Sequence, residues 1–124
     1  MGLDQWIFKK DPEFDYDSDE MCDDESVIYW RKAYAIHHYM EELFNGVENC
    51  GNYPIKLEDL IELRNTCQKI FDDHTLAKEL LPDIDRYEQY DEWYFMQIRN
   101  TIDQINNLVE AHSDEDEYYY HAWW

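Results

Sequence analysis

An apolar side chain recurs at every third or fourth position from Phe95 to Val109, and this seam constrains the fold more than any other feature of the sequence. Such steps keep side chains on one face of an α-helix. Asp91 precedes the seam and can serve as the helix N-cap. The pattern predicts a long helix with one buried face. Its apolar residues are Phe95, Ile98, Ile102, Ile105 and Val109.

Two earlier segments repeat this helical period. Residues 26–45 are expected to form one helix that stops before Gly46, because glycine often follows a helix C-terminus. A connector over residues 47–56 contains Pro54, and a second helix starts at Leu57. Residues 75–81 are expected to add helical turns before Pro82, and residues 82–90 form a polar loop. The apolar positions of the two helices are Ala33, Ile36, His37, Met40, Leu43, Phe44, Leu57, Leu60, Ile61, Cys67, Ile70 and Phe71.

The two ends of the chain favour strands. Residues 5–10 and 118–124 are rich in aromatic and β-branched side chains, which strands prefer. Pairing of the two ends would let each strand cover the other's edge. We therefore predict an α+β fold over a single domain, residues 1–124, with three main helices and a small terminal two-stranded ribbon. The aromatic C-terminal segment that ends in Trp123 and Trp124 is expected to face the core, with a partner surface as the alternative.

The acidic excess narrows the range of functions. The chain has 30 Asp and Glu against 10 Lys and Arg, a net charge of −20, yet 44% of its residues are hydrophobic, enough for a folded core. This charge repels phosphate and so excludes nucleic acids and anionic membranes as direct ligands. Neither a membrane span nor a signal peptide is recognisable. A cytoplasmic protein with basic partners is expected.

The acids gather in two runs that lie beside aromatic residues. The first run lies in an expected loop over residues 11–25, and the second follows the last predicted helix. Carboxylates next to aromatic rings suit a basic groove that normally holds nucleic acid, because the acids pair with Lys and Arg while the rings stack. Solvated faces that only keep the protein soluble are the alternative. The candidate partner-binding residues are Asp15, Asp17, Asp19, Glu20, Asp23, Asp24, Asp114, Glu115, Asp116 and Glu117.

A structural zinc ion is the second candidate feature. Three cysteines without a recognisable signal peptide argue for free thiols or metal ligands rather than a disulfide framework. His37, Cys50 and Cys67 lie on or between two helices joined by a short connector, and could fill three positions of a zinc tetrahedron that staples the core. The alternative is that all three are ordinary structural residues. The fourth ligand stays open among Asp4, Cys22, His38, His74, His112 and His121.

Known catalytic motifs are absent from the sequence. It has no glycine-rich phosphate loop, no nucleophile elbow and no His-Glu-x-x-His pair. A calcium loop starting at Asp15 fails because Glu20 and Ser26 stand where an EF-hand needs Gly and Glu. We therefore expect a binding protein rather than an enzyme.

Three stretches resemble a family of small acidic phage and prophage proteins. They are residues 1–4 (MGLD), residues 29–37 (YWRKAYAIH) and residues 90–95 (YDEWYF) followed by Thr101 and Ile102. The resemblance spans most of the chain and extends to a cysteine loop at Cys50 and a helical Cys67. It departs from the pattern in residues 11–25 and 82–90. It implies an anti-defence inhibitor, of the anti-CRISPR type that acts on a Cas9-type nuclease.

Charge and resemblance together predict a stoichiometric inhibitor whose acidic surface mimics DNA. It would occupy the basic channel of a Cas9-type nuclease in the host cytoplasm and block the loading of target DNA. The alternative is a small phage structural or regulatory protein with no nuclease target. Inhibition should saturate near one equivalent and weaken with salt, which distinguishes the two functions.

Overall fold

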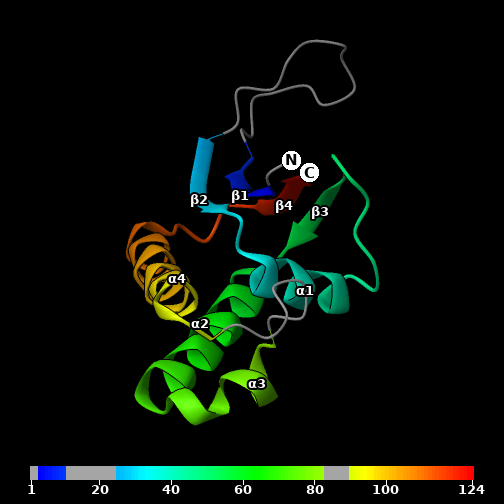
Figure 1. The fold of residues 1–124 in the computed structure, drawn as a ribbon. Coiled ribbons are helices and arrows are strands. Elements are labelled where there is room, and N and C mark those ends of the chain that lie inside the picture. The colour runs from blue at the N-terminus through cyan, green and yellow to red at the C-terminus, as the bar shows by residue number, and fades with distance from the viewer. Residues whose placement is uncertain (1–2, 11–24, 83–89) are drawn as a thin grey trace.

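The computed structural model describes residues 3–10, 25–82 and 90–124. In these residues four strands form one antiparallel sheet, and the helices lie on one side of it (Figure 1). The α+β class is confirmed, but there are four α-helices rather than three. In chain order the elements are β1 (Asp4–Lys9), β2 (Glu25–Arg31), α1 (Tyr34–Leu43), β3 (Asn52–Ile55), α2 (Leu57–Asp72), the 3-10 helix η1 (His74–Leu76), α3 (Ala77–Leu80), α4 (Glu92–Ala111) and β4 (Tyr118–Trp123).

The terminal strands pair as expected, but they form the centre of a larger sheet. The strand order is β2-β1-β4-β3, and β1 runs antiparallel to β4 from the Asp4–Trp123 pair to the Lys9–Tyr118 pair. The predicted two-stranded ribbon is therefore wrong. Two strands with aromatic side chains on both faces bury little by themselves, and β2 and β3 extend the surface that the helices cover.

Two of the predicted helices are confirmed. Helix α2 begins at Leu57, and the seam of α4 follows Asp91, whose carboxylate accepts a hydrogen bond from the Tyr94 backbone N–H at 3.1 Å. That bond satisfies one of the N–H groups left open at a helix start. The expected turns over residues 75–81 are η1 and α3. Helix α2 packs along α4 on the helical side of the sheet (Figure 1).

The predicted helix over residues 26–45 is wrong in its first part. Residues 25–31 form β2, and α1 begins only at Tyr34. Ile28 and Trp30 are buried while Tyr29 and Arg31 are exposed, so this stretch follows the period of a strand. Lys32 then takes a φ of 54°, a left-handed conformation that separates the strand from the helix.

The connector before α2 contains a strand that the sequence analysis missed. Strand β3 spans Asn52–Ile55 and pairs with β4 through Ile55 and Tyr118 at one end and Asn52 and His121 at the other. Pro54 lies within it, which is tolerated because β3 is an edge strand. Its pairing with β4, which is distant in sequence, is what makes it a strand.

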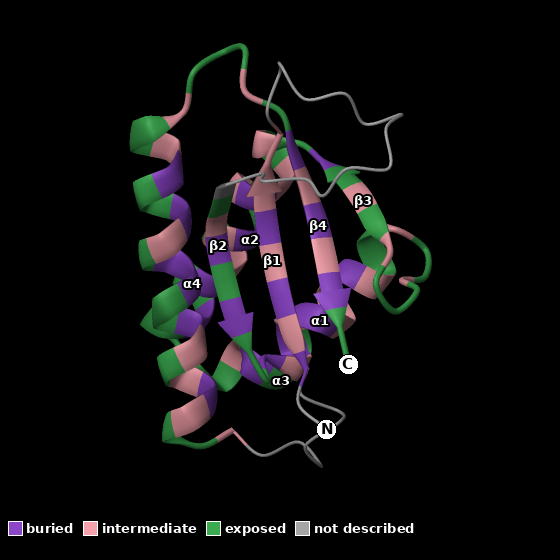
Figure 2. Ribbon diagram, turned by 90° about the horizontal axis from the view of Figure 1, so that it is seen from above, coloured by how far each residue is buried: buried purple, intermediate pink, exposed green. Residues whose placement is uncertain are grey.

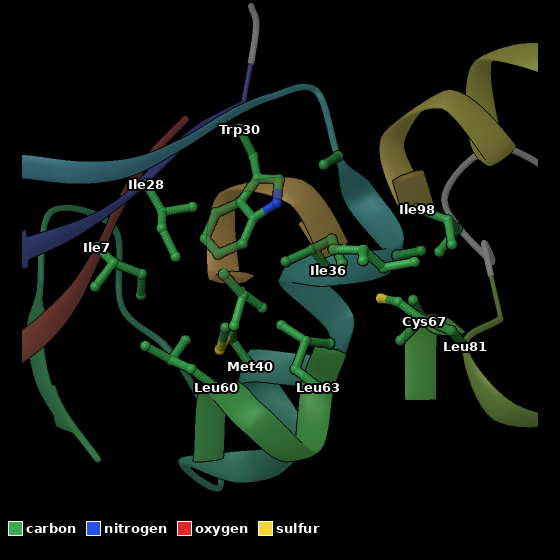
Figure 3. Packing of buried hydrophobic residues seen from close by; sticks show 14 of the residues in the cluster. Ile7, Ile28, Trp30, Ile36, Met40, Leu60, Leu63, Cys67, Leu81 and Ile98 are labelled. Carbon is green, nitrogen blue, oxygen red and sulfur yellow. The ribbon is translucent and has the colours of Figure 1, made fainter. Parts of the chain in front are cut away.

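The hydrophobic core lies between the sheet and the helices. Figure 2 shows buried and less buried residues alternating along β1 and β4, and Figure 3 shows Trp30 and Ile7 from the sheet facing Leu60 and Leu63 of α2. The Trp30 indole N–H donates to Thr101 Oγ1 of α4 at 2.9 Å. The buried ring therefore keeps its polar atom satisfied.

Two side-chain amides hydrogen-bond backbone groups, one at the β2 edge of the sheet and one at the end of the interior strand β4. Gln104 of α4 donates to the Tyr29 carbonyl at 2.9 Å and accepts from the Tyr29 N–H at 3.0 Å. Asn49 makes the same pair of bonds to the backbone of Trp124, both at 3.0 Å. Because β2 is an edge strand, the Gln104 amide occupies backbone groups with which a further strand would otherwise pair.

No helix among the residues that the structure describes is long and apolar enough to cross a membrane. This agrees with the absence of an apolar run of that length in the sequence.

Candidate interaction surface

The three predicted zinc ligands do not come together. His37 is buried on α1, Cys67 is buried on α2, and Cys50 lies exposed in the loop before β3. Among the described residues, no group of three or more His, Cys, Asp and Glu side chains is placed to hold a metal ion. The structure therefore does not confirm His37, Cys50 and Cys67 as a single zinc site, and this ligand set stays a prediction.

His37 belongs instead to a hydrogen-bonded network beneath the sheet. Its Nδ1 lies 3.2 Å from the Tyr120 hydroxyl, and its Nε2 lies 2.6 Å from a carboxylate oxygen of Glu41. Tyr120 in turn donates to Gln5 Oε1 at 2.5 Å, and Gln5 donates to the Ala33 carbonyl at 2.9 Å. The network ties β1, β4 and α1 together. Burial raises the pKa of Tyr120, so it holds its hydroxyl proton.

The two described cysteines differ in environment. Cys67 lies among aliphatic side chains of the core (Figure 3), and burial raises the pKa of its thiol to about 12. A thiol in such a setting is a packing group rather than a thiolate ligand. Cys50 takes a φ of 66°, and its thiol donates to Asn49 Oδ1 at 3.6 Å.

The proposed fourth ligands are scattered over the fold. His112 contacts the Tyr118 hydroxyl at 2.7 Å, His121 contacts Asn52 Oδ1 at 2.7 Å, and His74 stacks on Phe95. His38 lies beside Glu42, and Asp4 accepts from Tyr29. Cys22 lies outside the described residues. Zinc binding stays a prediction, which elemental analysis of the purified protein tests.

The second acidic run forms a turn before β4. Asp114, Glu115 and Glu117 are exposed, while Asp116 accepts from the Ser113 backbone N–H at 2.9 Å. That hydrogen bond lowers the pKa of Asp116, and Lys9 at 3.5 Å acts in the same direction. These four acids, Asp114 to Glu117, are called the acidic turn below. Asp114, Glu115 and Glu117 are reachable from solvent, and the lowered pKa of Asp116 favours its charged form.

The residues of the first acidic run lie outside the described residues. They are Asp15, Asp17, Asp19, Glu20, Asp23 and Asp24. The ends of this segment are defined, however. Lys9 of β1 pairs with Glu25 of β2 across the sheet, and the Lys10 N–H donates to the Glu117 carbonyl at 2.8 Å.

A shallow cleft of about 360 Å³ adjoins the acidic turn. It lies between the start of α2 and the chain before β4, and its charges are mixed. Asp114, Asp116 and Glu117 line it together with Lys10, Lys56 and His112. These bases partly offset the acids within the cleft, so the cleft alone is no stronger cation site than the turn beside it.

The surface that sequence reasoning missed is the second face of the sheet, opposite the helices. Trp6 lies against Tyr29 at 5.7 Å between ring centroids, against His121 at 5.6 Å and against Phe8 at 6.0 Å, and Phe8 stacks on Tyr119 at 5.4 Å. The register also directs Trp123 to this side, opposite Asp4. Trp6, Phe8, Tyr29, Tyr119, His121 and Trp123 are called the outer face below.

The alternation of strand side chains is the signal that could have revealed the outer face. In β4, Tyr118 and Tyr120 are buried while Trp123 remains 53% exposed. Trp124 is 37% exposed, so the expectation that the C-terminal segment faces the core is wrong for its two terminal tryptophans. Because the residues on both faces are aromatic, composition alone does not tell the faces apart.

No protein-family model matches the chain, and neither the curated proteins nor the solved structures contain a significant match.

Proposed function

We propose that the protein is a stoichiometric inhibitor that binds the basic, nucleic-acid-binding groove of a defence nuclease. The target class is a Cas9-type nuclease, as the sequence resemblance implies, and the bound protein keeps target DNA from loading. No bond of the target is cleaved. The net charge of −20 supplies the attraction to a basic groove.

The observation that carries this proposal is that the acidic turn lies at the end of the sheet where the chain leaves for the other acidic run and returns from it. The acidic turn lies beside Lys9 and Lys10, through the Lys9–Asp116 ion pair and the bond from the Lys10 N–H to the Glu117 carbonyl. The chain leaves the sheet after Lys10 for the other acidic run and returns at Glu25, which pairs with Lys9. Two runs about 90 residues apart in sequence thus attach to one place in the fold.

The place of the acidic turn at one end of the sheet has a physical consequence. Carboxylates gathered at one place steer a basic groove toward that place, whereas evenly spread charge would attract it in any orientation. Attraction between exposed charges is screened by salt, with a Debye length of about 8 Å at physiological ionic strength. Binding should therefore weaken steeply with salt.

The experiment is a titration of DNA cleavage by a Cas9-type nuclease, with the protein added before or after target DNA. The proposal predicts inhibition that saturates near one equivalent, only when the protein is added first. Inhibition far below one equivalent would indicate catalysis. Absence of inhibition and of binding would favour a phage structural or regulatory role.

Charge variants locate the contact. Neutralising the acidic turn by D114N, E115Q, D116N and E117Q should weaken inhibition at least about tenfold. The turn itself should persist, because the amide introduced by D116N keeps an oxygen that can accept the hydrogen bond from the Ser113 N–H. D15N, D17N and D19N should act in the same direction.

The matched control removes four exposed acids from the helical side, by E62Q, E79Q, D103N and E110Q. Equal losses in turn and control variants would leave only net charge and contradict a localised contact.

A further inference from the structure

We infer that the outer face binds arginine side chains of a basic protein partner. The inference rests on the proposed function for the sign of the partner's charge, and it adds a second contact surface and a chemical preference. The aromatic rings of the outer face supply stacking and cation–π contacts, which charge on the acidic turn cannot supply.

The outer face is a connected set of rings rather than scattered apolar residues. Trp6 touches three of the other rings at centroid distances of 5.6 to 6.0 Å, and Phe8 continues the set to Tyr119. No helix within the described residues lies over this side, as Figures 1 and 2 show. Tyr29 is 41% exposed and Trp123 53% exposed. The other four rings are partly exposed. A contiguous aromatic patch that stays open to solvent is characteristic of a binding site.

A carboxylate lies within this set of rings. The Tyr29 hydroxyl donates to Asp4 Oδ1 at 2.6 Å, and this hydrogen bond raises the pKa of Tyr29. Asp4 thus places its carboxyl group beside the Tyr29 side chain. An arginine side chain combines a flat cation, which stacks on a ring, with N–H donors that fit a carboxylate. A lysine ammonium satisfies only part of this arrangement.

Charge decides between the possible occupants. Single-stranded nucleic acid also stacks on aromatic sheet faces, but those sites pair their rings with a basic groove. Here the chain carries a net charge of −20. Among the described strand positions that face outward with these rings, Arg31 is the one Lys or Arg, and it lies opposite Asp4 in the register. A second copy of the chain would bring together two bodies of like charge. A cationic partner is attracted by the same field.

The edges of the sheet present fewer free groups for binding a partner than its outer face does. Gln104 occupies both backbone groups of Tyr29 at the β2 edge, and Pro54 removes an N–H from the β3 edge. Addition of a partner strand needs free backbone groups in a row. The face, which presents side chains, is therefore the surface open to a partner.

The test compares two peptides of equal length and charge, one alternating arginine with glycine and one alternating lysine with glycine. Calorimetric titration of the full chain should show the arginine peptide binding about three to ten times more tightly, the scale expected of one or two exposed cation–π contacts. Equal affinities would overturn the inference. A single-stranded oligonucleotide that binds more tightly than either peptide, or dimerisation through this face, would overturn it too.

Variants assign the preference to the face. W123A and Y29A should abolish the arginine preference, while F71A, which removes a ring 42% exposed on α2, should retain it. R31A should strengthen binding of both peptides, because it removes a like charge beside Asp4. Loss of the preference in F71A, or its survival in both W123A and Y29A, would contradict the inference.

The charge variants separate this inference from the proposed function. If the acidic-turn variant loses nuclease inhibition while W123A and Y29A inhibit normally and keep the arginine preference, the outer-face contact is wrong and the proposed function stands. If the arginine preference is present but no nuclease is inhibited, the outer face binds arginine and the proposed target is wrong.

Discussion

The two faces of the sheet are built from alternate residues of the same strands, yet their polar atoms are used differently. On the inner face the Trp30 N–H and the Tyr120 hydroxyl are both buried and both hydrogen-bonded to other side chains of the fold. On the outer face the Tyr29 hydroxyl binds Asp4 at an exposed position, and Trp123 is half exposed. The inner face is buried against the helices, whereas the outer face leaves part of its aromatic surface exposed.

The largest expected effect separates the faces by stability. W30A removes a fully buried ring and its bond to Thr101, and should lower the free energy of unfolding by about 3–5 kcal/mol, a large part of the stability of a small domain. W123A should cost no more than about 0.5 kcal/mol, because the ring is half exposed. Chemical denaturation measures both. Equal losses would mean that the two faces are not distinct.

Alkaline pH should destabilise the protein through its interior. The pKa of Cys67 is about 12 in the fold against 9.0 for an ordinary thiol, so between these values the unfolded chain releases a proton that the folded chain keeps. Stability should be unaffected by this thiol below pH 9 and should fall above it by about 1.4 kcal/mol per pH unit. Tyr120, whose pKa is also raised, adds to the loss above pH 10.

Denaturation curves at successive pH values test this, with C67A as the control. The variant should show a shallower decline between pH 9 and 11. An identical slope in C67A would show that Cys67 does not titrate differently in the two states.

The same hydroxyl deletion on the two faces sharpens the comparison further. Y120F removes the hydrogen bond to buried Gln5 and the contact with His37 Nδ1, and should cost about 1–3 kcal/mol. Y29F removes an exposed bond to Asp4 that water can replace, and should cost less than about 0.5 kcal/mol. Thermal unfolding of both variants gives the difference, and a costlier Y29F would reverse the assignment of roles.

The smallest of these effects concerns the sheet edge. Q104A exposes both backbone groups of Tyr29 and should lower stability by about 1 kcal/mol. It should also promote self-association, which sedimentation at rising concentration detects. N107A changes an exposed residue of the same helix and serves as the control. Without any increase in association over N107A, Gln104 does not protect the edge.

The parts of the fold that sequence reasoning predicted are those with local signals. Helix α4 is predicted by its apolar seam and by its N-cap residue Asp91. The pairing of β1 with β4 is predicted because both ends of the chain are aromatic and each strand needs a partner. The sequence analysis predicts a helix where β2 lies, because it extends the helical spacing of apolar residues to positions before Ala33. In those residues buried and exposed side chains alternate with the two-residue period of a strand. Strand β3 has four residues, one of them Pro54, and depends on β4 for its structure.

The candidate site shows the same division. The acidic turn could be predicted from the sequence because a run of consecutive acidic residues is visible there directly. The zinc set is not confirmed, because neighbouring helices do not fix the direction of their side chains: His37 contacts Tyr120 and Glu41, and Cys67 is buried in the core. The outer face was missed because Ile7 and Tyr120 on one side and Trp6 and Tyr119 on the other are all apolar or aromatic, so no polar alternation marks it.

The indole N–H signals of the five tryptophans give the most direct test of the two-face account. Nuclear magnetic resonance follows them while the arginine–glycine peptide is added to the intact wild-type protein. The account predicts that the signals of Trp6 and Trp123 shift in a saturable way while that of Trp30, bonded to Thr101, stays in place. A shift of Trp30 with Trp6 and Trp123 unchanged would contradict the assignment of binding to the outer face.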